Sequence, residues 1–399
     1  MDAAGEEGDD FTTYDQVAQF FNSMEDPSAQ ERIDGIVPVL VSLLPAPYVP
    51  APEVDSDSDD ERFSLFSFDS ESGASDDGAD HDAFTAAPSD GEDRISRLPD
   101  AFLADIIHRL PTKDAGRTAA LSTHWRRVWS GIPLLVDDTH LLGAGGISGV
   151  PVVRALSRCV AAHPGPVRGV RATHVSFYAH EYALRRLVAD LADKDVRDHI
   201  LVNRPWPLDM PLPNDIFRCA SLDRLYLGVW YFPKTTSAHP PAFPNLRELG
   251  LFHSIVGNQE LEALLAHCPK LEVLSLVISY HNPSRLRLAS GSLKIAVDWM
   301  SSFDEVAVED APSLQRLLFQ SIGNRRPVKI VGAPRLEVLG VLDLDLHTLE
   351  IGGTVIKAGM NVSASKMVPS LKILAVKVLF ACNREAKMLP PLLKMLSSP

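Results

Sequence analysis

The chain has 399 residues, with 52 acidic and 38 basic side chains and 45% hydrophobic residues, which is enough to bury a core in two or three domains. Its first ten residues lack the positive and apolar regions of a signal peptide, and no apolar run approaches the ~20 residues that span a bilayer. We therefore expect no membrane partner, and a location in the cytoplasm, the nucleus or both.

Charge divides the chain into two unlike parts. Residues 1–93 contain 25 acidic and only two basic side chains, whereas the remainder contains 27 acidic and 36 basic ones. From Glu53 to Asp93 the sequence is rich in Asp, Ser and Gly, and no apolar periodicity lasts a full helix. Such a segment cannot bury enough apolar surface to offset its ordering entropy. We expect residues 1–93 to form an acidic, largely disordered tail.

Two serines in this tail are candidate phosphorylation sites. Ser56 and Ser58 lie in the run SDSDDE, each with an acidic residue three positions later. An acid-directed kinase would read carboxylates at that spacing, and phosphate would add further negative charge. The simpler alternative is a solvated tail that is never modified, because charge runs usually only solvate.

Residues 94–136 predict three short helices. Apolar residues recur at three- and four-residue spacing over 102–110, and Pro111 ends that helix because it has no amide proton. Thr112 is a candidate cap for a second helix and Ser122 for a third. Three helices of this size cannot cover one another's apolar stripes, so we expect the leftover surface to meet another polypeptide.

The ordered set of paired Leu-Pro elements, I-I-x-x-L-P and S-x-x-W-R-x-x-W over residues 94–129 resembles an F-box. That resemblance implies docking onto a Skp-family adaptor and, through it, a cullin–RING ubiquitin ligase. The candidate residues for the adaptor contact or its immediate support are Leu98, Pro99, Ile106, Leu110, Pro111, Leu121 and Trp125. For each residue the alternative is a place in the core of the module itself, because apolar stripes serve both roles.

From residue 137 onward the pattern L-x-x-L-x-L recurs, with branched apolar substitutes. Its first positions are Leu222, Leu246, Leu271, Leu314, Leu336, Leu346 and Leu371. A period of about 20–29 residues with this signature predicts leucine-rich repeats, in which parallel strands stack as a solenoid. The gap before Leu314 indicates a degraded strand near Leu286 or Leu293. After residue 328 the strands lie too close together for helices, so we expect an outer face of short strands and loops.

The predicted fold class is therefore α/β, with an acidic tail (1–93), an F-box (94–136) and a leucine-rich-repeat solenoid (137–399) whose first repeats, to about residue 215, are irregular. With segments such as HPGPVRGVR (163–171), LVNRPWPLDMPLP (201–213) and RLYLGVW (224–230), the span 94–399 resembles grass-type plant F-box/leucine-rich-repeat proteins. Such relatives would add a strand after the helix predicted over 385–396. We therefore expect the solenoid to end without a cap, as a truncated form would.

No motif in the sequence predicts catalysis. The patterns G-x-S-x-G, H-E-x-x-H, G-x-G-x-x-G and the P-loop are missing. The four cysteines lie at least 49 residues apart, so we expect no disulfide framework, metal site or thioester-forming nucleophile. We predict a protein that is not an enzyme and needs no cofactor. The positive charge of 94–399 is spread without a basic run or stacking motif, so we do not expect nucleic acid as a partner.

The remaining function is recognition of another protein. In a repeat strand the leucines point inward, and the residues between them line the concave face. The candidate substrate-binding residues there are Arg224, Tyr226, Phe252, Val273, Arg316 and Leu318. Burial under the protein's own loops is the alternative.

The F-box resemblance completes the hypothesis. It implies the substrate-recognition subunit of an SCF (Skp–cullin–F-box) ubiquitin ligase, with the repeats holding an unknown target protein for ubiquitination. The alternative is a non-catalytic adaptor-binding scaffold, or a transcriptional co-regulator without a degradative role.

Overall fold

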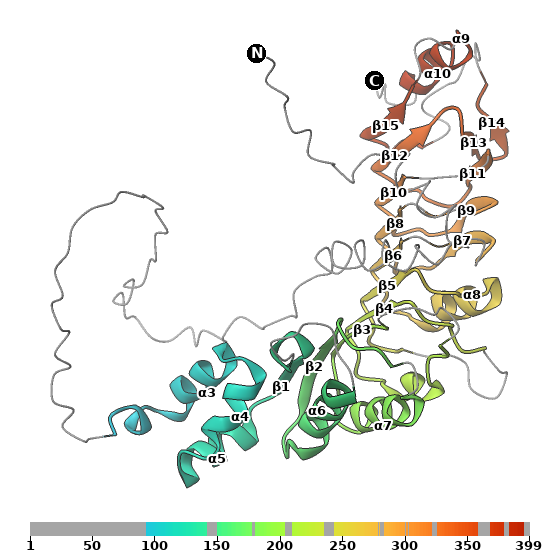
Figure 1. The fold of residues 1–399 in the computed structure, drawn as a ribbon. Helices are drawn as coiled ribbons and strands as arrows, with labels where there is room; N and C mark the ends of the chain where they lie inside the picture. The colour runs from blue at the N-terminus through green and yellow to red at the C-terminus, as the bar shows by residue number, and fades with distance from the viewer. Residues whose placement is uncertain are drawn as a thin grey trace, which may run out of the picture.

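The computed structural model describes residues 93–141, 150–177, 180–203, 210–234, 243–277, 279, 283–299, 301, 303–320, 325–357, 368–378 and 383–394 (Figure 1). The predicted acidic tail, including Ser56 and Ser58, lies outside the described residues apart from Asp93. Among the described residues, no helix is long and apolar enough to cross a membrane.

Three short helices form the first folded unit, as predicted. They are α3 (Asp100–Arg109), α4 (Thr112–Thr118) and α5 (Thr123–Gly131), and a turn of 3-10 helix, η1 (Ile95–Arg97), precedes them. Pro111 ends α3 because a residue before proline is driven into extended backbone, and Leu110 has φ −81° and ψ 147°. The unit has a small core of its own, formed by Leu103, Ile107, Ala115, Trp125, Val128 and Ile132.

One of the two predicted helix caps is correct. The Ser122 hydroxyl accepts a hydrogen bond from the Trp125 amide at 3.2 Å and caps α5. Thr112 does not cap α4; it is the first residue of the helix. Its hydroxyl instead lies 3.4 Å from the Leu135 carbonyl and 3.3 Å from His140 Nδ1, which ties α4 to the chain that follows α5.

The second folded part is built on a ten-stranded sheet, in which every neighbouring pair is parallel. Its strands in order are β1 (Leu134–Asp137), β2 (Val167–Ala172), β3 (Asp198–Val202), β4 (Arg224–Gly228), β5 (Glu248–Phe252), β6 (Val273–Val277), β8 (Ile295–Trp299), β10 (Arg316–Gln320), β12 (Val338–Asp343) and β15 (Ile373–Lys377). The predicted solenoid of parallel strands is confirmed. β1 crosses the predicted 136/137 boundary, so the sheet begins directly after the three-helix unit.

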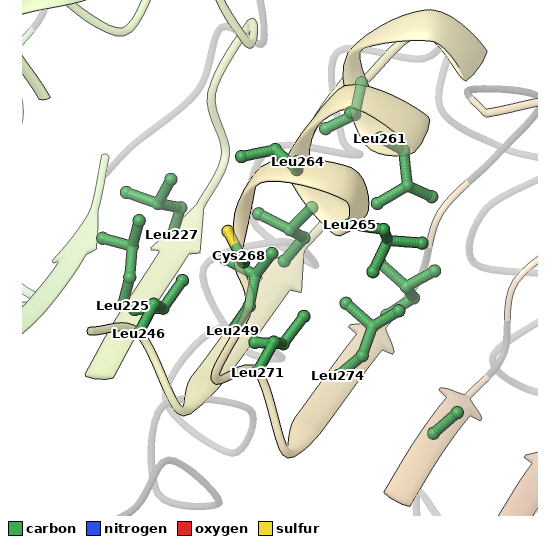
Figure 2. Close-up of a cluster of buried hydrophobic side chains, with 14 of the residues drawn as sticks. Leu225, Leu227, Leu246, Leu249, Leu261, Leu264, Leu265, Cys268, Leu271 and Leu274 are labelled. Atoms are coloured by element: carbon green, nitrogen blue, oxygen red, sulfur yellow. The ribbon is translucent and has the colours of Figure 1, made fainter. Parts of the chain in front are cut away.

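The repeat leucines hold the layers together. Leu225, Leu249 and Leu274 occupy the same register position on three neighbouring strands and are 1% exposed. They meet the apolar side of α8 (Asn258–His267), and Cys268 fills the turn that leads into the next strand (Figure 2). Burying leucines at a fixed spacing on neighbouring strands fixes their register, because a slip of one residue would turn them outward.

The elements that pack against the buried face of the ten-stranded sheet form a second layer. This layer changes from helices to strands along the solenoid. Its first half contains η2 (Asp138–Leu141), α6 (Val150–Ala162), α7 (Glu181–Ala192), η3 (Asn214–Arg218) and α8. Its second half is a five-stranded sheet: β7 (Arg285–Ala289), β9 (Glu305–Asp310), β11 (Arg326–Ile330), β13 (His347–Ile351) and β14 (Thr354–Val355). Figure 1 shows this sheet beside the later strands of the main sheet. The expected outer face of short strands is confirmed.

Three details differ from the sequence-based assignment. Both candidate positions for the degraded unit are strands, because Leu286 lies on β7 of the second sheet and Leu293 directly precedes β8 of the main sheet. The supposed unit that starts at Leu346 is not a repeat of the main sheet, since its strand is β13. The helix predicted over 385–396 is two short helices, α9 (Asn383–Ala386) and α10 (Leu389–Leu393).

Candidate protein-binding surfaces

The three-helix unit exposes large apolar side chains that its own core does not cover. Phe102 is 62% exposed and Leu121 is 67% exposed, and Ile95 and Leu98 are exposed as well. Exposed apolar side chains are ordinary when they are scattered singly and informative when they gather. These four residues gather, because they lie just before α3, on its first turn, or just before α5.

Two contacts bring the N-terminal ends of α3 and α5 together. His124 Nε2 of α5 lies 2.6 Å from the Asp100 carboxylate of α3, and the Trp125 indole N–H donates to the Ser96 hydroxyl at 2.7 Å. The hydrogen bond to His124 lowers the pKa of Asp100. Residues 95–102 and the turn at Leu121 therefore lie at one end of the unit. We call Ile95, Leu98, Phe102 and Leu121 the helix-end cluster.

The predicted adaptor residues divide into three groups. Leu98, Pro99, Pro111 and Leu121 are exposed, although Pro111 lies at the opposite end of α3. Ile106 and Leu110 are half-buried against the core of the unit. Trp125 is only 4% exposed, so its ring supports the surface from inside and is not available for contact.

Sequence reasoning did not select Ile95 and Phe102 as site residues. The apolar stripe over 102–110 did indicate an exposed apolar residue, because it contains five apolar residues and one small core cannot bury them all. Leu103 and Ile107 occupy the core, which leaves Phe102 facing outward.

The second surface is the face of the ten-stranded sheet that points away from the second layer. Side chains alternate along a strand, so residues between the buried leucines lie on this open face. On the later strands these residues are mostly apolar and half-buried, and Ile373 is 56% exposed. We call them the open-face patch: Val273, Val277, Ile295, Val297, Trp299, Leu318, Val338 and Ile373.

Arg316 lies within this patch. It is exposed and pairs in register with Ile295 on one side and Val338 on the other. Within the described residues no carboxylate pairs with it. The later half of the open face therefore offers apolar surface with one unmatched positive charge, an arrangement suited to an apolar segment that carries an acidic group.

The earlier half of the same face is closed by its own contacts. Arg224 Nε donates to Asp198 at 2.7 Å, and the Tyr226 hydroxyl donates to Glu248 at 3.0 Å. The Tyr226 ring covers Gly250, where a Cβ atom would come within 2.2 Å of the ring. Burial is the main cause that raises the pKa of Tyr226.

Phe252 corrects one prediction on this half. Its ring covers Gly228, whose Cβ, if present, would lie 2.5 Å from it, and the side chain is buried. Phe252 is therefore not a surface available to a substrate. Among the six candidate residues, Val273, Arg316 and Leu318 lie together on the open-face patch, whereas Arg224, Tyr226 and Phe252 pack within the protein.

A buried ion pair lies beneath the patch. Asp298 occupies an inward position of β8, in register with Leu276 of β6 and Phe319 of β10. The guanidinium group of Arg326, on β11 of the second sheet, donates to Asp298 at 3.1 Å, and both side chains are at most 2% exposed. Burial raises the pKa of Asp298 to about 7 against the attraction of Arg326.

Two cysteines of the solenoid lie in buried environments. Burial raises the pKa of Cys219 to about 12 and that of Cys268 to about 11, so both are protonated thiols at neutral pH. No group of three or more His, Cys, Asp or Glu residues among the described ones is placed to hold a metal ion.

Two family models match the chain. The F-box domain matches residues 95–137, and the leucine-rich repeats of the FBD-associated F-box protein At5g56370 match residues 184–397, more than half of the chain. The first match contains the helix-end cluster, and the second contains the open-face patch.

Curated relatives from Arabidopsis thaliana agree with both matches. The chain is 27% identical to F-box/FBD/LRR-repeat protein At1g13570 over 56% of this chain and 52% of the relative. It is 27% identical to putative F-box/FBD/LRR-repeat protein At5g44950, over 64% and 58% respectively. F-box/LRR-repeat protein At3g26922 is 26% identical over 65% of this chain and 92% of its own length.

The chain spans about half the length of the first two of these relatives. All three come from Arabidopsis, so a grass-type origin remains a prediction. Together, the three-helix unit, the parallel-strand solenoid and the repeat-family match place this chain in the plant F-box/leucine-rich-repeat protein family.

Proposed function

We propose that the protein is the substrate-recognition subunit of an SCF ubiquitin ligase. The helix-end cluster would bind a Skp-family adaptor, and the open-face patch would bind the target protein. The observation that carries the proposal is the large exposure of Phe102 and Leu121 at one end of a unit that the F-box model matches. Fully burying such a side chain stabilises a protein by roughly 1.5–3 kcal/mol, and a partner that covers the two side chains gains up to that free energy from each.

The chain itself would supply no reactive group. It would hold a target beside the ubiquitin-loaded conjugating enzyme carried by the cullin–RING subunits. Proximity raises the effective concentration of the target's lysines without a new chemical step on this subunit. We further propose that this occurs in the cytoplasm, the nucleus or both, which a fluorescent fusion would test.

The experiment is affinity purification with the ligase blocked by an inhibitor, followed by mass spectrometry. The full chain is compared with Leu121→Asp, which charges the helix-end cluster, and Leu318→Asp, which charges the open-face patch. We expect Leu121→Asp to lose the adaptor and keep the targets, and Leu318→Asp to show the reverse.

Turnover separates the ligase from the alternative scaffold or co-regulator. Targets captured by the wild-type chain should persist longer in cells that carry Leu121→Asp. If their half-lives are the same with both chains, the scaffold is supported and the degradative role is refuted.

A further inference from the structure

A cavity of about 610 Å³ lies where the three-helix unit meets the solenoid, away from both surfaces described above. Lys113 and Gly116 of α4 and Trp129 of α5 form part of its wall, and Arg158 and Cys159 of α6 form another part. We call it the junction cavity. Its size falls within the range of sites that enclose small molecules, about 300–1,000 Å³.

The charges that the described residues place around the cavity are of one sign. Lys113 and Arg158 line it, and none of the described residues in its wall carries a carboxylate. Both cations are exposed and, among the described residues, neither has an acidic partner. They come from different parts of the fold, so they converge only because the helices pack here. Most of the other lining atoms are apolar, from side chains such as Leu134 and Ala155.

A buried histidine forms part of the cavity wall. His163 lines the cavity and is 2% exposed; its Nε2 bonds the Ile132 carbonyl at 2.9 Å, and its ring packs edge-on against Trp129. Its Nδ1 is buried and has no hydrogen-bond partner in the described part of the chain. Burial lowers the pKa of His163, so with Nε2 donating, Nδ1 is an unused acceptor.

We propose that the junction cavity binds a small amphipathic anion: an apolar body with one acidic group. Lys113 and Arg158 would hold the acidic group, and the wall around Trp129 would cover the apolar body. This site goes beyond the proposed ligase function and does not depend on it. Because its wall comes from both folded parts, an occupant would brace one against the other.

The direct test is a fluorescence titration of the full chain with 8-anilinonaphthalene-1-sulfonate, an apolar ring system with one sulfonate. Decanoate should displace the probe, and decanol, which has the same chain length without the charge, should displace it at least about tenfold less effectively. Equal displacement by both compounds would overturn the assignment of an anion site.

Variants locate the binding. Gly116→Leu places a side chain in the cavity, and outside its own helix the nearest described heavy atom to its Cβ would be a Trp129 ring carbon at 4.0 Å, so the fold should tolerate it and the probe should be excluded. Arg158→Gln should weaken probe binding about fivefold or more. The matched control is Arg154→Gln, one turn earlier on α6 and exposed but not part of the cavity wall. Unchanged binding in Gly116→Leu, or equal losses in the two arginine variants, would refute the site.

Cys159 provides a second measurement that does not use the probe. It is half-buried in the cavity wall, whereas Cys219 and Cys268 are at most 1% exposed. Decanoate should slow alkylation of Cys159, measured by peptide mass spectrometry, and should leave the other two cysteines unchanged. Alkylation of Cys159 at the same rate with and without decanoate would contradict occupancy of the cavity.

Discussion

The buried pair between Asp298 and Arg326 makes a prediction about how the two sheets are joined. Besides Asp298, the guanidinium group donates to the Ser301 and Phe303 carbonyls at 3.3 and 3.1 Å. Asp298→Leu restores the leucine that the neighbouring strand carries at this position but leaves a cation buried without its carboxylate. Removing one partner of a buried pair costs about 3–5 kcal/mol. We expect a loss of that size in the free energy of unfolding.

A double-mutant cycle isolates the pair from its surroundings. Arg326→Met removes the cation, so Asp298→Leu combined with Arg326→Met should recover at least about 2 kcal/mol relative to the sum of the single losses. The assay is urea unfolding at pH 8, followed by circular dichroism. The reasoning fails if Asp298→Leu costs less than about 1 kcal/mol, or if the two losses simply add.

The pH dependence of the same residue follows from its raised pKa. Burial lifts the pKa of Asp298 from 3.8 to about 7, so the folded state holds the proton more tightly than the unfolded state. The resulting stabilisation is complete below pH 3.8 and is lost as the pH rises through 7. Relative to Asp298→Asn, which cannot titrate, the wild-type chain should lose stability between pH 4 and 7, by at most about 1.4 kcal/mol per pH unit. A difference that does not change with pH would contradict this.

Three further predictions concern single side chains. Ser122→Ala removes the cap of α5 and should cost about 1 kcal/mol in the free energy of unfolding, whereas the exposed Thr123→Ala should cost almost nothing; equal costs would contradict the cap. Trp125→Leu loses the hydrogen bond to Ser96 and leaves space in the core, so we expect a loss of about 3 kcal/mol or more; a loss below about 1 kcal/mol would place the ring outside the core. His199 is fully buried, and burial lowers its pKa from 6.5 to about 4, so stability should fall as the pH drops through that interval. In His199→Leu the urea midpoint should fall less between pH 6.5 and pH 4 than in the wild-type chain. An equal fall in both chains would refute the role of His199.

The repeat architecture was predictable because its signal is local. Leucines at fixed spacing indicate which side of a strand is buried, and they lie close together in the sequence. The three-helix unit was equally readable, since Pro111 and Ser122 mark helix ends by backbone chemistry that depends only on nearby residues.

The errors arose where a distant partner decides the role of a residue. β8 escaped the leucine pattern because Asp298 stands at a leucine position, and its compensating charge, Arg326, lies 28 residues away on another sheet. Phe252 is buried because Gly228 on the adjacent strand has no side chain to keep its ring out. Neither pairing can be recognised before the register between strands is known.

The adaptor surface shows the same limit at smaller scale. An apolar stripe does not tell which of its members fill the core, so the sequence left Trp125 open between contact, support and core, and it did not select Phe102. The two contacts that align α3 with α5 separate these roles, and both join residues more than 20 positions apart.

Binding of the purified chain to a recombinant Skp-family adaptor, measured by isothermal titration calorimetry, tests the central claim most directly. The wild-type chain should bind with a dissociation constant in the low micromolar range or tighter, and Phe102→Asp combined with Leu121→Asp should weaken binding at least about 100-fold while leaving the circular dichroism spectrum unchanged. A folded wild-type chain that does not bind the adaptor, or a double variant that binds equally well, would contradict the account.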